Sequence, residues 1–293
     1  MAAAADNAPT VATIWRLAPL AALLAAALAL YLPIYLAFAE GPWRQDENSH
    51  ALIIMAIAIG SAGIRLSTEK FSLTPTRSEQ AAGFALIVFG LLLIVAGNAG
   101  ETVLFLSASQ SFVATGVVVA LLGAAGARRL WFALALTLYL IIWPGWAVDA
   151  LTAPLKVMVS QIVADSLYAF GLPVAHAGAV ISAGPYQLLV AAACSGLNSL
   201  IALTAVGAVY LYAAKHSDWR INAAVLSALI PIAIAANILR VMALTLITYY
   251  LGYDAGQGFM HDGAGLVMFA AALGLVFVVD WAAMIAFSRR GRK

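Results

Sequence analysis

The chain contains one cysteine, Cys194, near one end of an apolar stretch that is long enough to cross a membrane. An arginine, Arg240, and a histidine, His261, lie near the ends of the next two such stretches. A cysteine reacts as its thiolate, which a nearby cation or a helix N-terminus stabilises. If the three side chains meet, Cys194 can attack a carbonyl carbon, His261 can exchange the proton and Arg240 can bind the oxyanion. These roles together describe acyl transfer from a peptide bond.

Each of the three residues also has an ordinary structural explanation. A lone buried cysteine usually packs as a small hydrophobic residue. The Arg240 side chain can extend to the membrane interface, and His261 can cap a helix or sit in a solvated loop. A charge inside a span is costly, however, and normally faces a partner or a water-filled cavity. The combination of Cys194, Arg240 and His261 therefore favours a catalytic site.

The composition indicates an integral-membrane protein. Hydrophobic residues make up 64% of the 293-residue chain and charged residues 10%, whereas roughly a quarter of the residues of a soluble domain are charged. The mean hydropathy is +0.98. A net charge of +2, with the basic residues in short clusters between apolar runs, argues against nucleic-acid binding. A single cysteine excludes an internal disulfide.

The apolar runs predict an all-α polytopic membrane protein with about eight transmembrane helices. The hydrocarbon core of a bilayer is about 30 Å thick, so a helix needs about 20 apolar residues to cross it. The predicted spans are 14–39, 50–66, 81–97, 102–125, 130–148, 187–213, 221–250 and 263–287. We expect one integral-membrane domain over 1–293, with 1–13 as a disordered N-terminal tail and 288–293 as a basic cytoplasmic tail.

The first span has an alternative interpretation as a cleaved signal peptide. Residues 37–39, Ala-Phe-Ala, resemble a signal-peptidase site. The apolar run before them is longer than the roughly 7–15 residues of a signal-peptide core, and Arg16 alone marks a basic flank. These features favour an uncleaved helix.

The basic residues predict the orientation of the spans. With both termini in the cytoplasm, all of the 15 Lys and Arg residues except Arg44, Lys156 and Arg240 fall at the cytoplasmic side, as the positive-inside rule requires. The sixth span then runs inward, with Cys194 about two turns after its start, and the seventh reaches Arg240 after about 30 Å. Because His261 immediately precedes the eighth span, all three residues are expected at the outer face.

Three parts of this plan are less regular than the rest. Four polar residues interrupt the fourth span: Ser107, Ser109, Gln110 and Ser111. Pro231 lacks the N–H that the seventh helix needs at that point and is expected to kink it. The outer connection 149–186 predicts an amphipathic or re-entrant helix at the outer interface, followed by a short strand or hairpin over 178–185.

Four segments resemble known signature regions. Ala-Cys-Ser-Gly-Leu at 193–197, Asn-Ile-Leu-Arg at 237–240 and His-Asp-Gly-Ala-Gly at 261–265 are similar to the three signatures of the exosortase and archaeosortase family. Segment 43–50 resembles that family's first outer loop, in which an Asp is followed by Ser-His. The order and the predicted side of the membrane agree for all four segments.

The resemblance implies an intramembrane cysteine transpeptidase or protease at the outer face of the cell inner membrane. Its partners would be exported proteins with a PEP-CTERM-like C-terminal sorting tail, which consists of a short motif, a transmembrane helix and a basic cluster. Cys194, Arg240 and His261 would be the catalytic residues, and the reaction would pass through a thioacyl intermediate. No cofactor, metal ion or nucleic acid is expected.

Several further residues are candidates for holding the substrate or the catalytic groups. Asn198 lies one helical turn after Cys194, and Asn237 lies one turn before Arg240, so each shares a helix face with its catalytic neighbour. Both amides can instead pack between helices. The remaining candidates are Ser195 and, in the first outer loop, Asp46 and His50; helix capping by Asn48 or Ser49 explains that loop almost as well.

The family pattern is not matched everywhere. Many exosortases have an acidic residue two positions before the cysteine and a basic residue two positions after the glycine, where this chain has Ala192 and Asn198. These differences leave the subtype and its sorting tail open. A zinc site built from Cys194, His50 and His261 is disfavoured, because structural zinc ligands usually come in close pairs.

Two other functions remain open at this stage. In a transporter or permease, Arg240 would contact the substrate and Pro231 would mark a broken helix. The third possibility is a noncatalytic subunit of an envelope polysaccharide export system. Replacing Cys194 with Ala separates these from the enzyme, because neither alternative requires the thiol.

Overall fold

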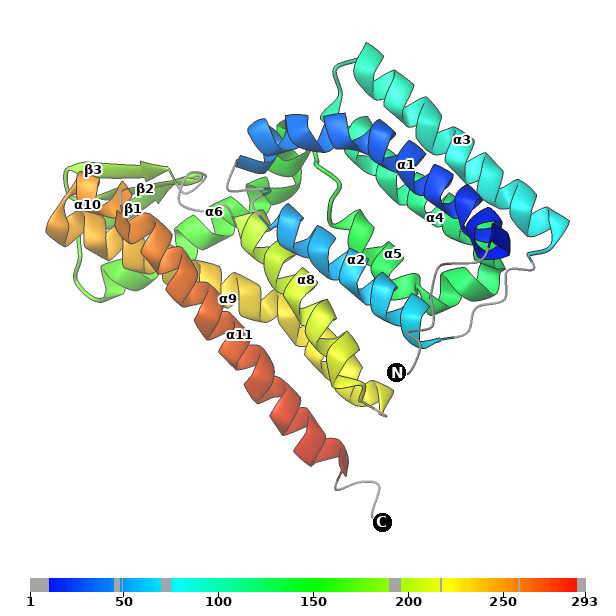
Figure 1. Ribbon diagram of the computed structural model, residues 1–293. Helices are drawn as coiled ribbons and strands as arrows, with labels where there is room; N and C mark the ends of the chain where they lie inside the picture. The colour runs from blue at the N-terminus through cyan, green and yellow to red at the C-terminus, as the bar shows by residue number, and fades with distance from the viewer. Residues whose placement is uncertain are drawn as a thin grey trace, which may run out of the picture. The chain divides into compact units, whose positions relative to one another are not determined.

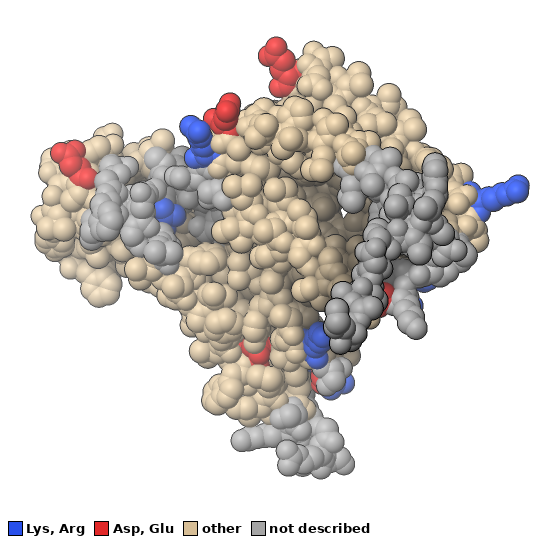
Figure 2. Space-filling view, in the orientation of Figure 1, with Lys and Arg blue, Asp and Glu red and all other residues tan. Residues whose placement is uncertain are grey.

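The computed structural model describes residues 11–44, 48, 50–69, 75–189, 196–216, 218–257 and 259–288. The chain forms two compact units, Met1–Gln45 and Asp46–Lys293. Figure 1 shows that both are built mainly from helices. On the face seen in Figure 2, Lys, Arg, Asp and Glu are few and separated by broad uncharged surface, as expected of a protein solvated by lipid.

The first unit contains helix α1 (Val11–Glu40) and the short 3-10 helix η1 (Pro42–Arg44). Trp43 folds back onto α1, where its ring stacks on Tyr35 at a centroid distance of 5.6 Å and meets Phe38 edge-on at 5.7 Å. Arg44 Nε donates a hydrogen bond to the Ala39 carbonyl. These contacts fix the turn that ends α1.

In the second unit, α3 (Arg77–Ala99) and α4 (Val103–Arg129) pack closely along each other. Gly83 and Gly116 permit this approach, because a Cβ on either would lie 2.7 Å from a backbone oxygen of the other helix's glycine. Small residues are the usual means of bringing membrane helices together. The predicted spans 81–97 and 102–125 are therefore confirmed as a helical pair.

Helix α4 is interrupted near its end. Gly123 has a φ of +68°, which is left-handed, and the carboxylate of Glu79 accepts the Ala124 N–H that follows the interruption, at 2.9 Å. Glu79 also completes the capping box of α3 with Thr76. One carboxylate thus caps two helix segments.

The predicted span 130–148 is wrong as a single helix. It contains α5 (Trp131–Leu138), which at 1.5 Å per residue is only about 12 Å long, a non-helical stretch over 139–144, and the beginning of α6 (Gly145–Ala169). Pro144 explains the break, because the residue before a proline is driven out of the helical region. Pro144 itself forms the N-cap of α6.

Three polar residues of the fourth span form hydrogen bonds with the backbone at this break. Ser107 Oγ accepts the Ile142 N–H at 2.9 Å, Ser111 Oγ donates to the Thr137 carbonyl at 3.1 Å, and Gln110 Nε2 donates to the Leu140 carbonyl at 3.4 Å. Non-helical backbone at membrane depth requires such partners, since lipid supplies none.

The segment predicted as an outer interfacial helix is helical up to Ala169 in the structure. Helix α6 has 25 residues, begins before Pro154 and continues through it, and is long and apolar enough to cross a membrane. A three-stranded antiparallel sheet follows, with β1 (Val174–Ala177), β2 (Val180–Ala183) and β3 (Tyr186–Leu189) in that order. The strand expected within 178–185 is confirmed, and the fold is predominantly rather than entirely helical.

The remaining helices form a bundle: α8 (Gly196–Ala214), α9 (Trp219–Leu251), α10 (Tyr253–Gln257) and α11 (Phe259–Ser288). Helix α9 packs along both α8 and α11, and it is continuous through Pro231. Leu203, Leu229, Ala233, Ala272 and Val276 form the buried centre of this bundle.

Six helices of the described chain are long and apolar enough to span a membrane, among them α2 (Ala51–Thr68). Parts of α1 and α8 are shorter apolar helices. The ends of α2, α4 and α8 meet, because Arg65 bonds Tyr212 and Arg129 lies 3.9 Å from Glu69. Three segments predicted on the cytoplasmic side therefore share one end of the second unit.

Candidate functional site

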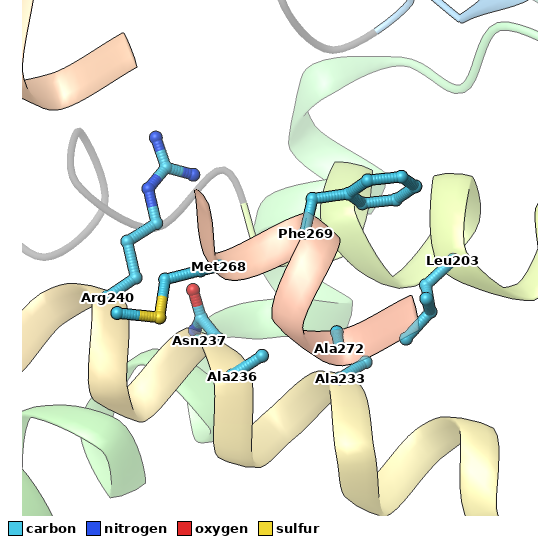
Figure 3. A pocket seen from close by; sticks show the side chains of 8 residues that line it. All are labelled: Leu203, Ala233, Ala236, Asn237, Arg240, Met268, Phe269 and Ala272. Atoms are coloured by element: carbon cyan, nitrogen blue, oxygen red, sulfur yellow. The ribbon is translucent and has the colours of Figure 1, made fainter. Parts of the chain in front are cut away.

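Arg240 is buried within the bundle, with an exposed fraction of 8%. It lies on α9 beside Asn237, one turn earlier and 6% exposed. Together with residues of α8 and α11 they line a small pocket of about 20 Å³ (Figure 3), which is enough for roughly one water molecule. The other lining residues are Leu203, Ala233, Ala236, Met268, Phe269 and Ala272.

The side chains in this pocket have a clear arrangement. Figure 3 shows the Arg240 guanidinium at the opposite end of the pocket from Leu203, with Met268 of α11 beside the arginine stem. Small residues, Ala233 and Ala236, occupy the α9 wall. An apolar pocket with one cation at its end suits a ligand group that carries or develops negative charge.

The other side of α9 is held by α6 and the sheet. Val241, next to Arg240, is 2% exposed and belongs to a buried cluster with Val163 of α6 and with Ile181 and Leu188 of the sheet. Ile238 packs against the same cluster. The sheet and α6 therefore fix the rotation of α9 that keeps Arg240 in its pocket.

The register of α8 against α9 places the start of α8 level with Arg240. The two helices are antiparallel, since a Cβ on Gly207 would touch Leu229 and Leu203 shares a pocket wall with Ala233. Gly196 is seven residues from Leu203, and Arg240 is seven residues from Ala233, so both lie about 10 Å further along. The backbone that follows Cys194 thus enters the bundle at the depth of Arg240.

The expected start of the sixth span needs correction. The sixth span was predicted to begin at 187, about two turns before Cys194, but 186–189 is strand β3 and α8 begins at Gly196. Alternation in this stretch, with Leu188 buried and Gln187 exposed, is typical of a strand. Cys194 and Ser195 lie outside the described residues.

Two of the predicted site residues are described only through their backbone. Asn198 lies in the first turn of α8 and His261 in the first turn of α11, and their side chains are outside the described part. Helix α11 packs on α9 with Ala272 beside Ala233. His261 is eleven residues before Ala272, so the first turn of α11 reaches about one turn beyond Arg240.

The first outer loop is less closely linked to this pocket. Asp46 lies outside the described residues. His50, rather than Asn48, is the N-cap residue of α2, and its side chain makes no capping bond; Ser49 lies outside the described residues. Burial lowers the pKa of His50 below its ordinary value. His50 is not among the residues that line the Arg240 pocket.

Sequence reasoning missed two features of this bundle. The pocket wall formed by Met268 and Phe269 looks in the sequence like any apolar helix face. Near the other end of α8, the Tyr210 hydroxyl donates to Asp280 of α11 at 2.6 Å. In the sequence, an acidic residue within an apolar span is the signal that indicates such a contact, because a buried charge needs a partner.

Fold and site together define a polytopic membrane protein in which α8, α9 and α11 meet at a buried arginine. A family model described as transmembrane exosortase matches residues 43–278, and the chain belongs to this family. The match includes the position of every candidate site residue named above. Neither a curated protein nor a solved structure matches the chain.

Proposed function

We propose that the protein is an intramembrane cysteine transpeptidase or protease that cleaves C-terminal PEP-CTERM-like tails from exported proteins. The observation that carries this proposal is the buried Arg240, which is level with the start of α8 and packs against α11. In the sequence, Cys194 is two residues before the first residue of α8, and His261 is the third residue of α11. Family membership supports the same reaction class.

The reaction proceeds in two acyl transfers. The Cys194 thiolate attacks the carbonyl carbon of the scissile peptide bond, and the negative charge moves to the carbonyl oxygen, where Arg240 donates hydrogen bonds. The C–N bond then breaks, and His261 protonates the leaving amine. Water or an amine attacks the thioester, loses its proton to His261 and releases the Cys194 thiolate.

The short sequence separation between Cys194 and Gly196, the first residue of α8, favours the reactivity of the thiol. The N-terminus of a helix carries partial positive charge, which stabilises a thiolate. Arg240 at the same depth adds a full positive charge close to the start of α8. Both effects lower the cost of forming the nucleophile where water is scarce.

We place the active site at the outer face of the inner membrane. This rests on the distribution of Lys and Arg, which puts the Arg65, Arg129 and Lys215 end on the cytoplasmic side. Arg240 lies toward the other end of α9, about 30 Å from its start. An exported substrate that is anchored by its own transmembrane tail reaches this depth from outside.

The test coexpresses the enzyme with a tailed protein and follows the loss of the tail by gel mobility. Cys194→Ala and His261→Ala should leave the precursor intact, and Arg240→Ala should slow processing by about 10²–10³-fold, the usual effect of losing one oxyanion donor. Arg220→Ala, at the exposed start of the same helix, and His176→Ala, on an exposed strand, are the matched controls. Equal processing by all variants would refute the proposal.

A transporter remains the alternative, and one structural finding bears on it. A transporter is expected to have a broken helix at Pro231, but α9 is continuous there. The non-helical stretch lies at 139–144 instead. Transport that survives Cys194→Ala, in cells where no tailed protein is processed, would favour this alternative. The same substitution is also silent for a noncatalytic export subunit.

A further inference from the structure

An open groove of about 680 Å³ lies between α2 and the C-terminal half of α8, two helices that lie side by side in Figure 1. Its walls are mostly apolar: Ile57, Ile64, Phe132 and Val209 line it together with the faces of Gly60 and Tyr212. Gly60 widens the groove, since a Cβ at that position would meet nothing within 4 Å. Both helices lie in the part of the chain that the sequence places in lipid.

One end of this groove is basic. Arg65, Glu69 and Lys215 line it, and Arg129 lies 3.9 Å from Glu69, so two cations pair with one carboxylate and Lys215 adds a third positive charge. Arg65 is already engaged, because it pairs with Glu69 and donates to the Tyr212 hydroxyl at 2.7 Å. The rim therefore carries net positive charge beyond what Glu69 neutralises.

Lys215 is the cation available to a ligand. It is exposed, and among the described residues no carboxylate lies within ion-pairing distance of it. Its φ of +48° is left-handed, a conformation that costs a non-glycine residue free energy and is retained where surroundings or function require it. This turn directs the chain away from α8 just where the lysine borders the groove.

We propose that this groove binds one anionic phospholipid of the predicted cytoplasmic leaflet. The headgroup phosphate lies at Lys215, and an acyl chain follows Ile64, Ile57 and Val209 into the membrane. Charge complementarity selects the ligand, because basic pockets between transmembrane helices on the cytoplasmic side suit anionic headgroups. The proposal does not rest on the peptidase activity.

Two glycines on α2 provide a matched pair of variants. Gly60→Leu fills the groove, whereas Gly63→Leu adds the same side chain one turn later at a glycine that does not line it; a Cβ at either position meets nothing within 4 Å. Both changes favour the helix equally. For the charge, Lys215→Asn tolerates the left-handed backbone, and Lys215→Arg retains the cation.

The experiment uses the full-length protein purified in a zwitterionic detergent. Dioleoyl phosphatidylglycerol, dioleoyl phosphatidylcholine and inorganic phosphate are added separately, retained lipid is counted by native mass spectrometry, and the thermal unfolding midpoint is recorded. The unaltered protein and Gly63→Leu should retain one phosphatidylglycerol and unfold about 5 °C higher with it. Phosphatidylcholine and inorganic phosphate should have little effect.

Gly60→Leu should retain phosphatidylglycerol no better than phosphatidylcholine, and Lys215→Asn should weaken its retention about fivefold, with Lys215→Arg unchanged. Equal retention by Gly60→Leu and Gly63→Leu would overturn the proposal and indicate lipid bound all around the protein, or a groove filled by a protein helix. A response to phosphate equal to that of phosphatidylglycerol would overturn it in favour of an anion site. None of these readouts depends on tail cleavage.

Discussion

Asp280 of α11 accepts a hydrogen bond from Tyr210 of α8, with 2.6 Å between the carboxylate Oδ2 and the phenol oxygen. The other carboxylate oxygen lies 2.8 Å from His216 Nε2. Asp280 is 1% exposed, so the Tyr210 hydroxyl replaces water that the carboxylate loses on burial. Because both partners belong to α8 and the residues that follow it, the contact fixes α11 along α8, far from Arg240.

Tyr210→Phe should destabilise the protein by about 1–3 kcal/mol, since a buried acceptor loses its donor. Thermal unfolding in detergent measures this loss. Tyr250→Phe, on an exposed tyrosine of α9, removes the same hydroxyl without such a contact and should change little. Equal shifts for the two variants would show that the hydrogen bond to Asp280 is not important for stability.

The interruption between α5 and α6 depends on a serine of α4. Ser107→Ala removes the acceptor of the buried Ile142 N–H, and we expect a loss of about 1–3 kcal/mol. Ser227→Ala is the control, because that hydroxyl is exposed and bonds only a carbonyl of its own helix. A stability of Ser107→Ala equal to that of the control would mean that the non-helical stretch finds other partners.

The break in α4 should not tolerate a side chain. Gly123 has a φ of +68°, and a Cβ there would lie 3.1 Å from both carboxylate oxygens of Glu79. Gly123→Ala should therefore cost about 1–2 kcal/mol in backbone strain alone. Gly63→Ala, in a regular helix with open space around it, should be neutral or stabilising. Urea unfolding in mixed micelles compares the two, and a neutral Gly123→Ala contradicts the prediction.

His50 gives the structure a pH dependence at the start of α2. Burial lowers its pKa below the ordinary value of 6.5, so the unfolded chain binds the proton at higher pH than the folded chain does. Stability should consequently fall as the pH drops through 6.5 and level off below the folded-state pKa. Between pH 8 and pH 5 the unfolding midpoint of His50→Gln should fall less than that of the unaltered protein; an equal fall would exclude His50 as the source.

Much of the helical layout follows from composition and length. Helices α2, α3 and α9 lie close to the predicted spans 50–66, 81–97 and 221–250, because each is a single apolar run with polar ends. The Arg240 pocket also agrees with the prediction that a charge within a span faces a cavity. In these cases the signal is local, and the bilayer thickness converts it directly into structure.

The parts that differ depend on contacts between distant segments. The apolar stretch 139–144 is predicted as helix from its sequence, and its bonds to Ser107 and Gln110 make another backbone acceptable. Likewise, the residues of strand β3 continue the apolar run of the sixth span in the sequence. Their pairing with β2 makes them a strand. The polar residues of α4 are visible as irregularities in the sequence, but their pairing with this stretch is not.

The central claim is that Cys194, Arg240 and His261 converge, and cross-linking of introduced thiols tests it most directly. Because Cys194 is the only natural cysteine, Arg240→Cys, His261→Cys and the control Arg220→Cys each contain two thiols. A short bifunctional methanethiosulfonate reagent, followed by mass spectrometry of the intact protein, should join Cys194 to position 240 and to position 261 but not to position 220. Failure to join either 240 or 261, with both thiols reactive toward single-ended reagents, would contradict the account.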